Sequence, residues 1–277
     1  MYYEISKNSE IRVYTLTEFD AGHIFDCGQT FRYRNSDDCY TIFSKNKNCL
    51  LQKGNGCVII KTEDTDYFVN YFDLERDYSA IKDNLAKRDG LKESLEYGYG
   101  IRILNQDPYE MIMSFIISAN NNIPRIKGIL ERICENLGEK NEFGYSFPTP
   151  EKMASADERF FYKTGAGYRS PYLVETANKL LSYDLNALFA MNTSEARKEL
   201  MKLKGIGGKV ADCILLFAYH KTDVFPMDTW SKKIYDALGY EKETNPNKMS
   251  ERLVHSFGEM SGYAQQYLYY YYRNRIK

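Results

Sequence analysis

The sequence predicts an α+β protein in which a small N-terminal antiparallel β-sheet domain precedes an all-helical domain. Residues 11–73 contain short runs rich in β-branched and aromatic residues, separated by turn-forming segments. From about residue 74 onward, apolar residues instead recur at helical spacing. We expect the sheet domain, with covering helices, to span residues 1–97 and the helical domain to span residues 98–277.

Four segments of the N-terminal region have the composition of strands. The connecting segments NSDD, NKN and GNG are rich in residues that favour turns. Strands this short with turns this tight predict an antiparallel meander, whose apolar face needs a covering layer. The predicted strands are QTFRYR (29–34), CYTIFSK (39–45), CLLQK (49–53) and CVIIKTE (57–63).

The second half shows start and stop signals for helices. Asp107, Pro108 and Glu110 match an N-cap, a first helical position and a capping box. A second helical pattern stops at Gly138, and a third begins with a Ser-Pro cap at Ser170. The predicted helical segments are 107–119, 123–138, 170–182, 194–205, 209–220, 229–239 and 263–274.

The composition is that of an ordinary globular protein, with 43% hydrophobic and 27% charged residues among 277. No apolar run is long enough to span a bilayer, and the N-terminus lacks the pattern of a secretion signal. The six scattered cysteines contain no C-x-x-C pair, which argues against a zinc ribbon, an iron–sulfur cluster or a disulfide framework. We therefore expect a protein of a reducing, bacterial cytoplasm.

The net charge of −1 gives no global case for binding nucleic acid, so any such binding requires a localised surface. The segment LKGIGGKVADC (203–213) offers one, because it joins two helices of a hairpin spanning residues 195–219. Gly205 and Gly207 permit a tight turn, and the free N–H groups that open the second helix favour a phosphate. The alternative is a plain helical hairpin with a glycine C-cap.

Lys209 stands in the first turn of that second helix, where the helix dipole disfavours a cation. Cys213 follows at i+4, on the same face. An amine nucleophile has to be neutral, and both burial and a helix N-terminus are expected to lower a lysine pKa. The alternative is a solvated lysine that supports phosphate binding. Asp228, two residues after Pro226, is predicted to cap a helix and to hold a carboxylate near a developing positive charge.

These motifs, in this order, resemble the helix-hairpin-helix DNA glycosylases. Within that superfamily the sequence is similar to the 8-oxoguanine DNA glycosylase/lyase branch. The resemblance implies an enzyme that flips 8-oxoguanine out of double-stranded DNA, displaces it through a lysine Schiff base and cleaves the strand by β-elimination. The matching segments are GQTFRYR (28–34), QDPYE (106–110), FIISANNNIPRI (115–126), GAGYRSPYL (165–173), GIGGKVADC (205–213) and GYAQQYL (262–268).

The resemblance also implies a role for individual residues. Lys209 attacks C1′ and Asp228 stabilises the charge that grows on the sugar. The Gly28 carbonyl senses the N7 hydrogen that distinguishes 8-oxoguanine from guanine. Cys213 and Tyr269 sandwich the base, and Gln265 reads its Watson–Crick edge. The implied base-binding set is Gly28, Cys213, Phe217, Gln265 and Tyr269.

The same resemblance implies a DNA-binding surface and a preference for cytosine opposite the lesion. Asn120 fills the gap left by the base, Tyr168 wedges the stack, and two arginines bond the orphaned partner base. The implied DNA-binding residues are Asn120, Arg125, Tyr168, Arg169, Gly205, Gly207 and Val210. The backbone carbonyls of Met201, Leu203 and Ile206 are implied ligands of a monovalent or calcium cation.

We expect a nucleoid-associated monomer that requires no cofactor and binds no membrane. Two alternatives stay open at this point. A monofunctional glycosylase of the same superfamily, acting on alkylated bases, commonly lacks the hairpin lysine. A non-catalytic helix-hairpin-helix DNA-binding protein needs neither Asp228 at this spacing nor the segment SANNN.

Overall fold

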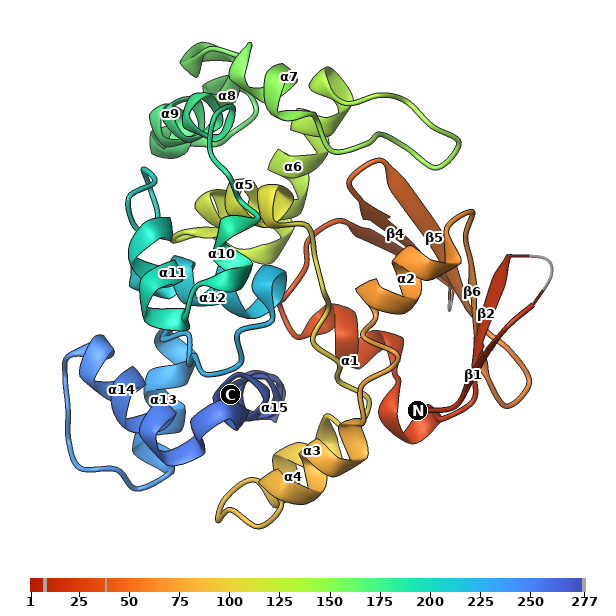
Figure 1. Ribbon diagram of the computed structural model, residues 1–277, viewed down its shortest axis with the longest axis vertical. Helices are drawn as coiled ribbons and strands as arrows, with labels where there is room; N and C mark the ends of the chain where they lie inside the picture. The colour runs from red at the N-terminus through yellow and green to blue at the C-terminus, as the bar shows by residue number, and fades with distance from the viewer. Residues whose placement is uncertain (7–8, 38, 276–277) are drawn as a thin grey trace.

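The computed structural model describes residues 1–6, 9–37 and 39–275. An antiparallel sheet lies at one side of the molecule, and the helices from α5 onward lie at the other (Figure 1). The described strands run in the order β1-β2-β6-β5-β4-β3, and the predicted α+β class is confirmed. The strands are β1 (Tyr3–Ile5), β2 (Glu10–Val13), β3 (Tyr33–Ser36), β4 (Cys39–Ser44), β5 (Lys47–Lys53) and β6 (Val58–Lys61).

Two features of the sheet differ from the prediction. The short strands β1 and β2 were not predicted, and the first predicted strand, residues 29–34, is a strand only from Tyr33 onward. Before it, the Gln29 amide is fully buried and donates to the carbonyls of Ile24 (2.9 Å) and Arg102 (2.8 Å). The hydrogen bonds that the Gln29 amide donates hold residues 29–32 outside the sheet, where the chain runs toward the helices.

Helices α1 (Ala21–Asp26) and α2 (Thr65–Tyr71) supply the covering layer that the sheet needs. Their apolar side chains join those of the strands in one buried cluster, which includes Ile11, Phe25 and Phe68. Helices α3 (Tyr78–Leu85) and α4 (Lys92–Tyr97) pack instead into the cluster of the helical half. The assignment of residues 1–97 to the sheet domain and 98–277 to the helical domain stays a prediction.

The helical half is built around α5, most of whose side chains are buried, and α12 packs along it. In the described part of the chain, no helix is both long and apolar enough to cross a membrane. The helices are α5 (Pro108–Ser118), α6 (Ile123–Leu137), α7 (Pro150–Ala154), α8 (Glu158–Lys163), α9 (Ser170–Leu180), α10 (Ala187–Ala190), α11 (Thr193–Leu200), α12 (Gly208–Tyr219), α13 (Thr229–Ala237), α14 (Pro246–Phe257) and α15 (Ser261–Arg275).

Two of the predicted caps are wrong. Asp107 caps α5 by accepting from the Glu110 N–H at 2.9 Å, but the Glu110 carboxylate does not complete a capping box. It is buried and pairs with Arg32 at 3.2 Å, which ties the segment before β3 to α5. Ser170 does not cap α9, because its hydroxyl donates to the Gly167 carbonyl at 2.7 Å. Each side chain therefore bonds to something other than its own helix terminus: Glu110 to a residue distant in the sequence, and Ser170 to the turn that precedes α9.

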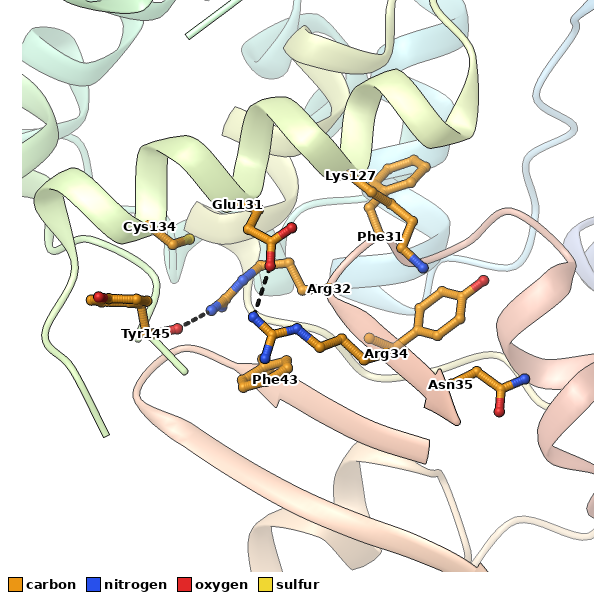
Figure 2. A pocket seen from close by; sticks show the side chains of 10 residues that line it. Phe31, Arg32, Arg34, Asn35, Phe43, Lys127, Glu131, Cys134 and Tyr145 are labelled. Carbon is orange, nitrogen blue, oxygen red and sulfur yellow. Dashed lines mark hydrogen bonds and ion pairs between the residues drawn. The ribbon is translucent and has the colours of Figure 1, made fainter. Parts of the chain in front are cut away.

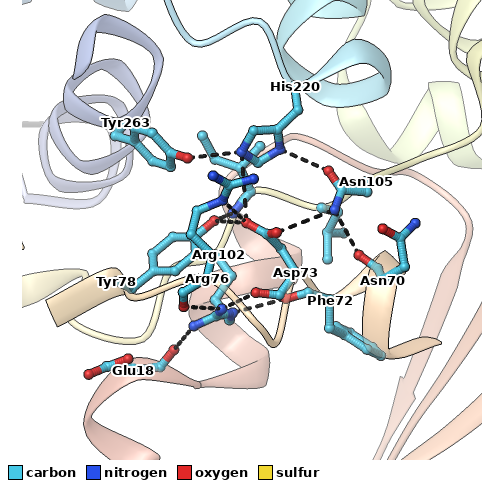
Figure 3. Close-up of polar contacts among 12 residues, drawn as sticks. Glu18, Asn70, Phe72, Asp73, Arg76, Tyr78, Arg102, Asn105, His220 and Tyr263 are labelled. Carbon is cyan, nitrogen blue, oxygen red and sulfur yellow. Dashed lines mark hydrogen bonds and ion pairs between the residues drawn. The ribbon is translucent and has the colours of Figure 1, made fainter. Parts of the chain in front are cut away.

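A buried polar network joins the sheet half to α12 and α15 (Figure 3). The Arg102 guanidinium is fully buried and donates to the backbone carbonyl of Asp73. The ring of His220, at the end of α12, contacts Asn105 Oδ1 at 2.8 Å and the Tyr263 hydroxyl at 2.9 Å. Burial lowers the pKa of His220 to about 4. This network fixes the far end of the helix that begins beside Lys209.

The run of four tyrosines in α15 divides between two roles. Tyr269 lines a pocket, whereas Tyr270 packs on Tyr97 of α4 with ring centroids 5.3 Å apart. The Tyr271 hydroxyl donates to Glu93, also on α4, at 2.6 Å. The run therefore docks α15 on α4 and leaves one ring for the pocket.

Candidate active site

The glycine hairpin connects α11 to α12 as predicted. Gly205 has a φ of +83°, and a methyl group there would lie 2.9 Å from the Tyr172 ring, so glycine is required at this turn. Gly207 is extended, with a φ of −92°, and is the N-cap of α12 without any side-chain cap. A methyl group on Gly207 would meet nothing within 4 Å. The first N–H groups of α12 are thus uncapped beside open space, which suits an approaching phosphate.

Lys209 is half-buried in the first turn of α12, with its ammonium 5.6 Å from the centre of the Phe115 ring. The adjacent Cys213 sulfur raises the pKa of Lys209, burial opposes this, and the Asp228 carboxylate adds to the rise. Burial raises the pKa of Cys213 to about 11, although Lys209 opposes that shift. The expected lowering of the lysine pKa is therefore wrong, because nearby sulfur and carboxylate groups compensate the cation.

Asp228 is the N-cap of α13, where its Oδ1 accepts from the Ser231 N–H at 2.8 Å. The Ser231 hydroxyl in turn donates to the Pro226 carbonyl at 2.8 Å. This local ring of bonds holds the carboxylate in one place. Its electrostatic effect on Lys209 shows that the capping carboxylate also acts on the lysine. Asp228 thus caps α13 as predicted, and its role beside a developing positive charge stays a prediction.

One small pocket brings together the two implied catalytic residues and the five implied base-binding residues. Its cavity volume is about 50 Å³, little more than the share of one or two waters in the liquid, so the walls have to move to admit a base. Four further residues line it that the sequence analysis did not assign to the site, namely Cys27, Phe115, Pro226 and Gln266. The lining is Cys27, Gly28, Phe115, Lys209, Cys213, Phe217, Pro226, Asp228, Gln265, Gln266 and Tyr269.

Gly28 and Tyr269 form one side of this pocket. Gly28 has a φ of +80°, and a methyl group on it would lie 3.5 Å from Tyr269 Cε1. The Arg273 guanidinium stacks over the Tyr269 ring at 5.2 Å and donates to the Asp26 carbonyl. Arg273 therefore connects the ring to the backbone that precedes Gly28. The only sequence signal for Arg273 is its position one helical turn after Tyr269.

Two buried glutamines and two stacked phenylalanines form other parts of the wall. The Gln266 amide donates to Gln265 Oε1 at 2.6 Å, and both side chains are at most 4% exposed. The rings of Phe115 and Phe217 stack with centroids 5.8 Å apart and an angle of 17° between their planes. Sequence reasoning missed Gln266 and Phe115, because both lie in apolar helical patterns that predict core positions.

The implied DNA-binding residues of the SANNN segment and of residues 168–169 lie outside this pocket. Asn120 is exposed in a left-handed conformation, with a φ of +49°. The Arg169 side chain is buried and donates to the Ala119 and Asn120 carbonyls, the latter at 2.8 Å. Arg169 thus holds the Asn120 turn, whereas Arg125 is exposed.

The exposed Tyr168 ring stacks on Arg169, 4.3 Å from its guanidinium. Val210, in the first turn of α12, is buried.

A larger cavity of about 300 Å³ lies between the sheet and α6, and none of the predicted site residues lines it (Figure 2). Arg34 crosses this cavity to pair with Glu131 at 2.7 Å, and the Lys127 ammonium lies 3.5 Å from the centre of the Tyr33 ring. Its charged groups are therefore already paired or stacked, and we do not place the chemistry there.

No cluster of three or more histidine, cysteine, aspartate or glutamate side chains suited to a metal occurs among the described residues. All six cysteines are free thiols. The hairpin carbonyls of Met201, Leu203 and Ile206 remain as candidate ligands. The Leu203 carbonyl already accepts from the Ile206 N–H at 3.3 Å and keeps a second lone pair.

A glycine hairpin that presents a lysine and a capping aspartate to a buried pocket, on an α+β fold, defines a base excision DNA repair protein of the helix-hairpin-helix class. Comparisons with known proteins agree. The family model described as the HhH-GPD superfamily base excision DNA repair protein matches residues 113–259, and that of the 8-oxoguanine DNA glycosylase N-terminal domain matches residues 12–112. The chain belongs to the 8-oxoguanine DNA glycosylases of the HhH-GPD superfamily.

Individual relatives show how far the likeness extends. A probable N-glycosylase/DNA lyase of Methanothermobacter thermautotrophicus is 32% identical over 72% of this chain and 70% of its own length. The N-glycosylase/DNA lyase of Saccharomyces cerevisiae is 28% identical over 85% of this chain and 72% of its own. The Clostridium acetobutylicum 8-oxoguanine glycosylase/lyase, solved with double-stranded DNA containing cytosine opposite 8-oxoguanine, superposes with a TM-score of 0.94 at 38% identity, covering 100% and 99% of the two chains.

Proposed function

We propose that this chain is a bifunctional DNA glycosylase and lyase that excises 8-oxoguanine from double-stranded DNA, preferably opposite cytosine. The observation that carries the proposal is the shared pocket of Lys209, Asp228 and the five implied base-binding residues. These residues come from four separate parts of the chain, and one reaction needs them all. A base inside a duplex cannot reach such a pocket, so the nucleotide has to be extruded first.

The first chemical step forms a bond from Lys209 Nζ to C1′ and breaks the bond from C1′ to N9 of the base. The base leaves with the electron pair of that bond. Because the pKa of Lys209 is raised, its ammonium has to lose a proton before it attacks. Asp228 is the carboxylate of the pocket lining, so in its ionised form it stabilises the positive charge on the sugar, and the departing base takes up the proton that Lys209 releases.

The second step uses the Schiff base that then joins Lys209 to the opened sugar. The iminium acidifies the C2′ hydrogen, and its removal expels the 3′ phosphate, which breaks the strand 3′ to the lesion. Water then hydrolyses the Schiff base and restores the lysine. The uncapped N-terminus of α12 supports this chemistry by holding a backbone phosphate beside the lysine.

Selection of the base and of its partner rests on separate residues. The Gly28 carbonyl accepts the N7 hydrogen of 8-oxoguanine, whereas the lone pair of guanine N7 would oppose that oxygen. Asn120 enters the gap in the duplex, and Tyr168 wedges the stack beside it. Arg125, which is exposed, donates to the acceptor edge of cytosine. Arg169 acts mainly by holding the turn that presents Asn120.

We also propose that the hairpin carbonyls of Met201, Leu203 and Ile206 bind a monovalent or calcium cation when DNA is present. Carbonyl oxygens suit such hard cations, and the cation would neutralise part of the charge of a nearby phosphate. Exchanging potassium for tetramethylammonium at equal ionic strength, with a chelator present to remove calcium, is expected to weaken DNA binding. Equal affinity in the two salts would contradict this cation site.

We also propose that the protein acts as a monomer at the bacterial nucleoid. A fluorescently tagged copy in live cells is expected to follow the DNA stain.

The decisive test is borohydride trapping on a duplex with one 8-oxoguanine opposite cytosine. We expect the wild-type protein to form a covalent complex and Lys209→Gln to form none. Free base release without trapping would indicate a monofunctional glycosylase. Neither release nor trapping would leave only a DNA-binding module.

A further inference from the structure

Gln266 is a buried residue of α15 that lines the base pocket next to Gln265. Its side chain is 2% exposed. Its Nε2 donates to Gln265 Oε1 at 2.6 Å, but its own Oε1 is buried and has no hydrogen-bond partner in the described part of the chain. Buried polar atoms are nearly always paired in proteins, so an unpaired acceptor in a pocket wall points to a partner that arrives with the ligand.

The bond between the two amides determines what each one offers to a base. Gln265 Oε1 accepts from Gln266 and keeps a second lone pair, and the Nε2 of Gln265 carries its donors. Gln266 Oε1 is an acceptor that no described residue occupies. The Watson–Crick edge of 8-oxoguanine carries an acceptor at O6 and donors at N1 and at the exocyclic amine on C2. Gln266 Oε1 therefore adds a second acceptor for the donors of this edge, beside the oxygen of Gln265.

We propose that Gln266 is a second base-reading residue, whose Oε1 accepts a hydrogen bond from the exocyclic amine of the extruded 8-oxoguanine while its Nε2 orients Gln265. The inference rests on the proposed function, since it concerns the same pocket. It adds a second acceptor, directed at the amine at C2, to the Watson–Crick edge that Gln265 is implied to read. The contact selects oxidised guanine over oxidised purines that lack this amine.

A purely structural role is the competing explanation. Gln266 could serve only to orient Gln265, or simply to fill the interior between α15 and its neighbours. Either role would affect every substrate that enters the pocket. Only a direct contact couples the two changes, so that the effect on excision of removing the Gln266 amide depends on whether the base carries the amine.

The experiment removes each partner of the proposed bond separately. Duplexes carry 8-oxoguanine or 8-oxohypoxanthine, which lacks only the C2 amine, opposite cytosine. Single-turnover excision is measured for the wild type and for Gln266→Leu, which keeps the approximate volume and removes the amide. Comparing the ratio of the two rates between the wild type and the variant cancels differences in leaving-group chemistry and duplex stability.

We expect the wild type to prefer 8-oxoguanine, and Gln266→Leu to reduce that preference by about tenfold, the usual size of one buried hydrogen bond in a specificity ratio. Gln266→Met repeats the measurement with a flexible side chain in case the leucine variant folds poorly. Gln106→Leu is the matched control, because Gln106 is an equally buried glutamine outside the pocket. Its substrate ratio is expected to equal that of the wild type.

The outcomes separate this inference from the function on which it rests. If the wild type does not excise 8-oxoguanine at all, the proposed function fails. If it does, and the ratio is the same in the wild type and in both Gln266 variants, the contact to the amine does not exist. A wild type without preference between the two bases overturns the inference as well.

Discussion

The backbone of Gly28 passes the ring of Tyr269 at van der Waals distance, so that a methyl group on Gly28 would lie 3.5 Å from Tyr269 Cε1. The glycine adopts a φ of +80°, a conformation that side chains disfavour. The carbonyl implied in sensing N7 is part of this left-handed turn of the backbone. Its position therefore depends on residue 28 being a glycine.

The substitution Gly28→Ala is expected to lower 8-oxoguanine excision about tenfold or more, because alanine at positive φ costs about 1–2 kcal/mol and relaxation moves the carbonyl. Gly56→Ala is the matched control, since Gly56 has a φ of +69° in the turn between β5 and β6 and a methyl group there would meet nothing within 4 Å. Both variants are expected to lose similar stability in urea unfolding. Equal excision by the two would argue against a sensing role for the Gly28 carbonyl.

The raised pKa of Lys209 predicts how excision depends on pH. Below that pKa the amine is protonated and cannot attack, so the single-turnover rate is expected to rise with pH throughout the range below the raised pKa. Cys213→Ala removes the largest cause of the raised pKa and is expected to move the midpoint to lower pH. A midpoint unchanged by this substitution would show that the sulfur does not set the protonation of the lysine.

Replacing Asp228 separates its capping role from its charge. Asp228→Asn keeps a good N-cap for α13 and is expected to leave the free energy of unfolding nearly unchanged. The loss of the charge is expected to reduce excision by roughly 10²–10³-fold. Asp157→Ala, which removes the N-cap of α8 away from the pocket, should show the opposite pattern, with about 1 kcal/mol lost in stability and normal excision. Full excision activity of Asp228→Asn would mean that Asp228 serves only as the N-cap of α13.

The two arginines of the DNA surface are expected to respond differently. Arg125 is exposed, so Arg125→Ala should leave stability intact and reduce the preference for cytosine over adenine by about tenfold or more. Arg169 is committed to the carbonyls of Ala119 and Asn120, so Arg169→Lys should lower excision opposite every base to a similar degree. Excision opposite all four bases measures both effects. If Arg169→Lys, and not Arg125→Ala, reduced the preference for cytosine, Arg169 would have to leave the carbonyls and read the base.

His220 predicts a loss of stability in acid. Its pKa is about 4 in the folded protein and about 6.5 when unfolded, so below pH 6.5 the unfolded state binds a proton that the folded state excludes. Stability is therefore lost as the pH falls from about 6.5 to 4, and at pH 5 the loss from this group is about 2 kcal/mol. His220→Asn tolerates the left-handed backbone, with a φ of +50°, and should remove this part of the pH dependence. The free energy of unfolding in urea is measured against pH for both proteins. If it depends on pH in the same way in the wild type and in His220→Asn, His220 is not the group that causes the loss of stability.

Much of the fold was predictable from local chemistry. The turn residues between short β-branched runs gave the antiparallel meander, and Asp107 with Pro108 marked the start of α5. The caps that failed were those whose side chains bonded elsewhere, Glu110 to the buried arginine of the sheet half and Ser170 to the carbonyl of Gly167 in the preceding turn. Likewise, residues 29–32 have the composition of a strand, but the buried Gln29 amide takes them out of the sheet.

The sequence by itself determined the order of the elements, the glycine hairpin with its lysine and the capping aspartate, because propensity, capping and spacing act between near neighbours along the chain. Only the tertiary structure decided which side chains share a pocket and what charge they carry. Gln266 and Arg273 became part of the site through packing of α15 against the hairpin and the segment before Gly28. The pKa of Lys209 rises rather than falls because its interactions with Cys213, one turn away on the same helix, and with the Asp228 carboxylate of the next helix outweigh burial, and only the packed site decides that balance.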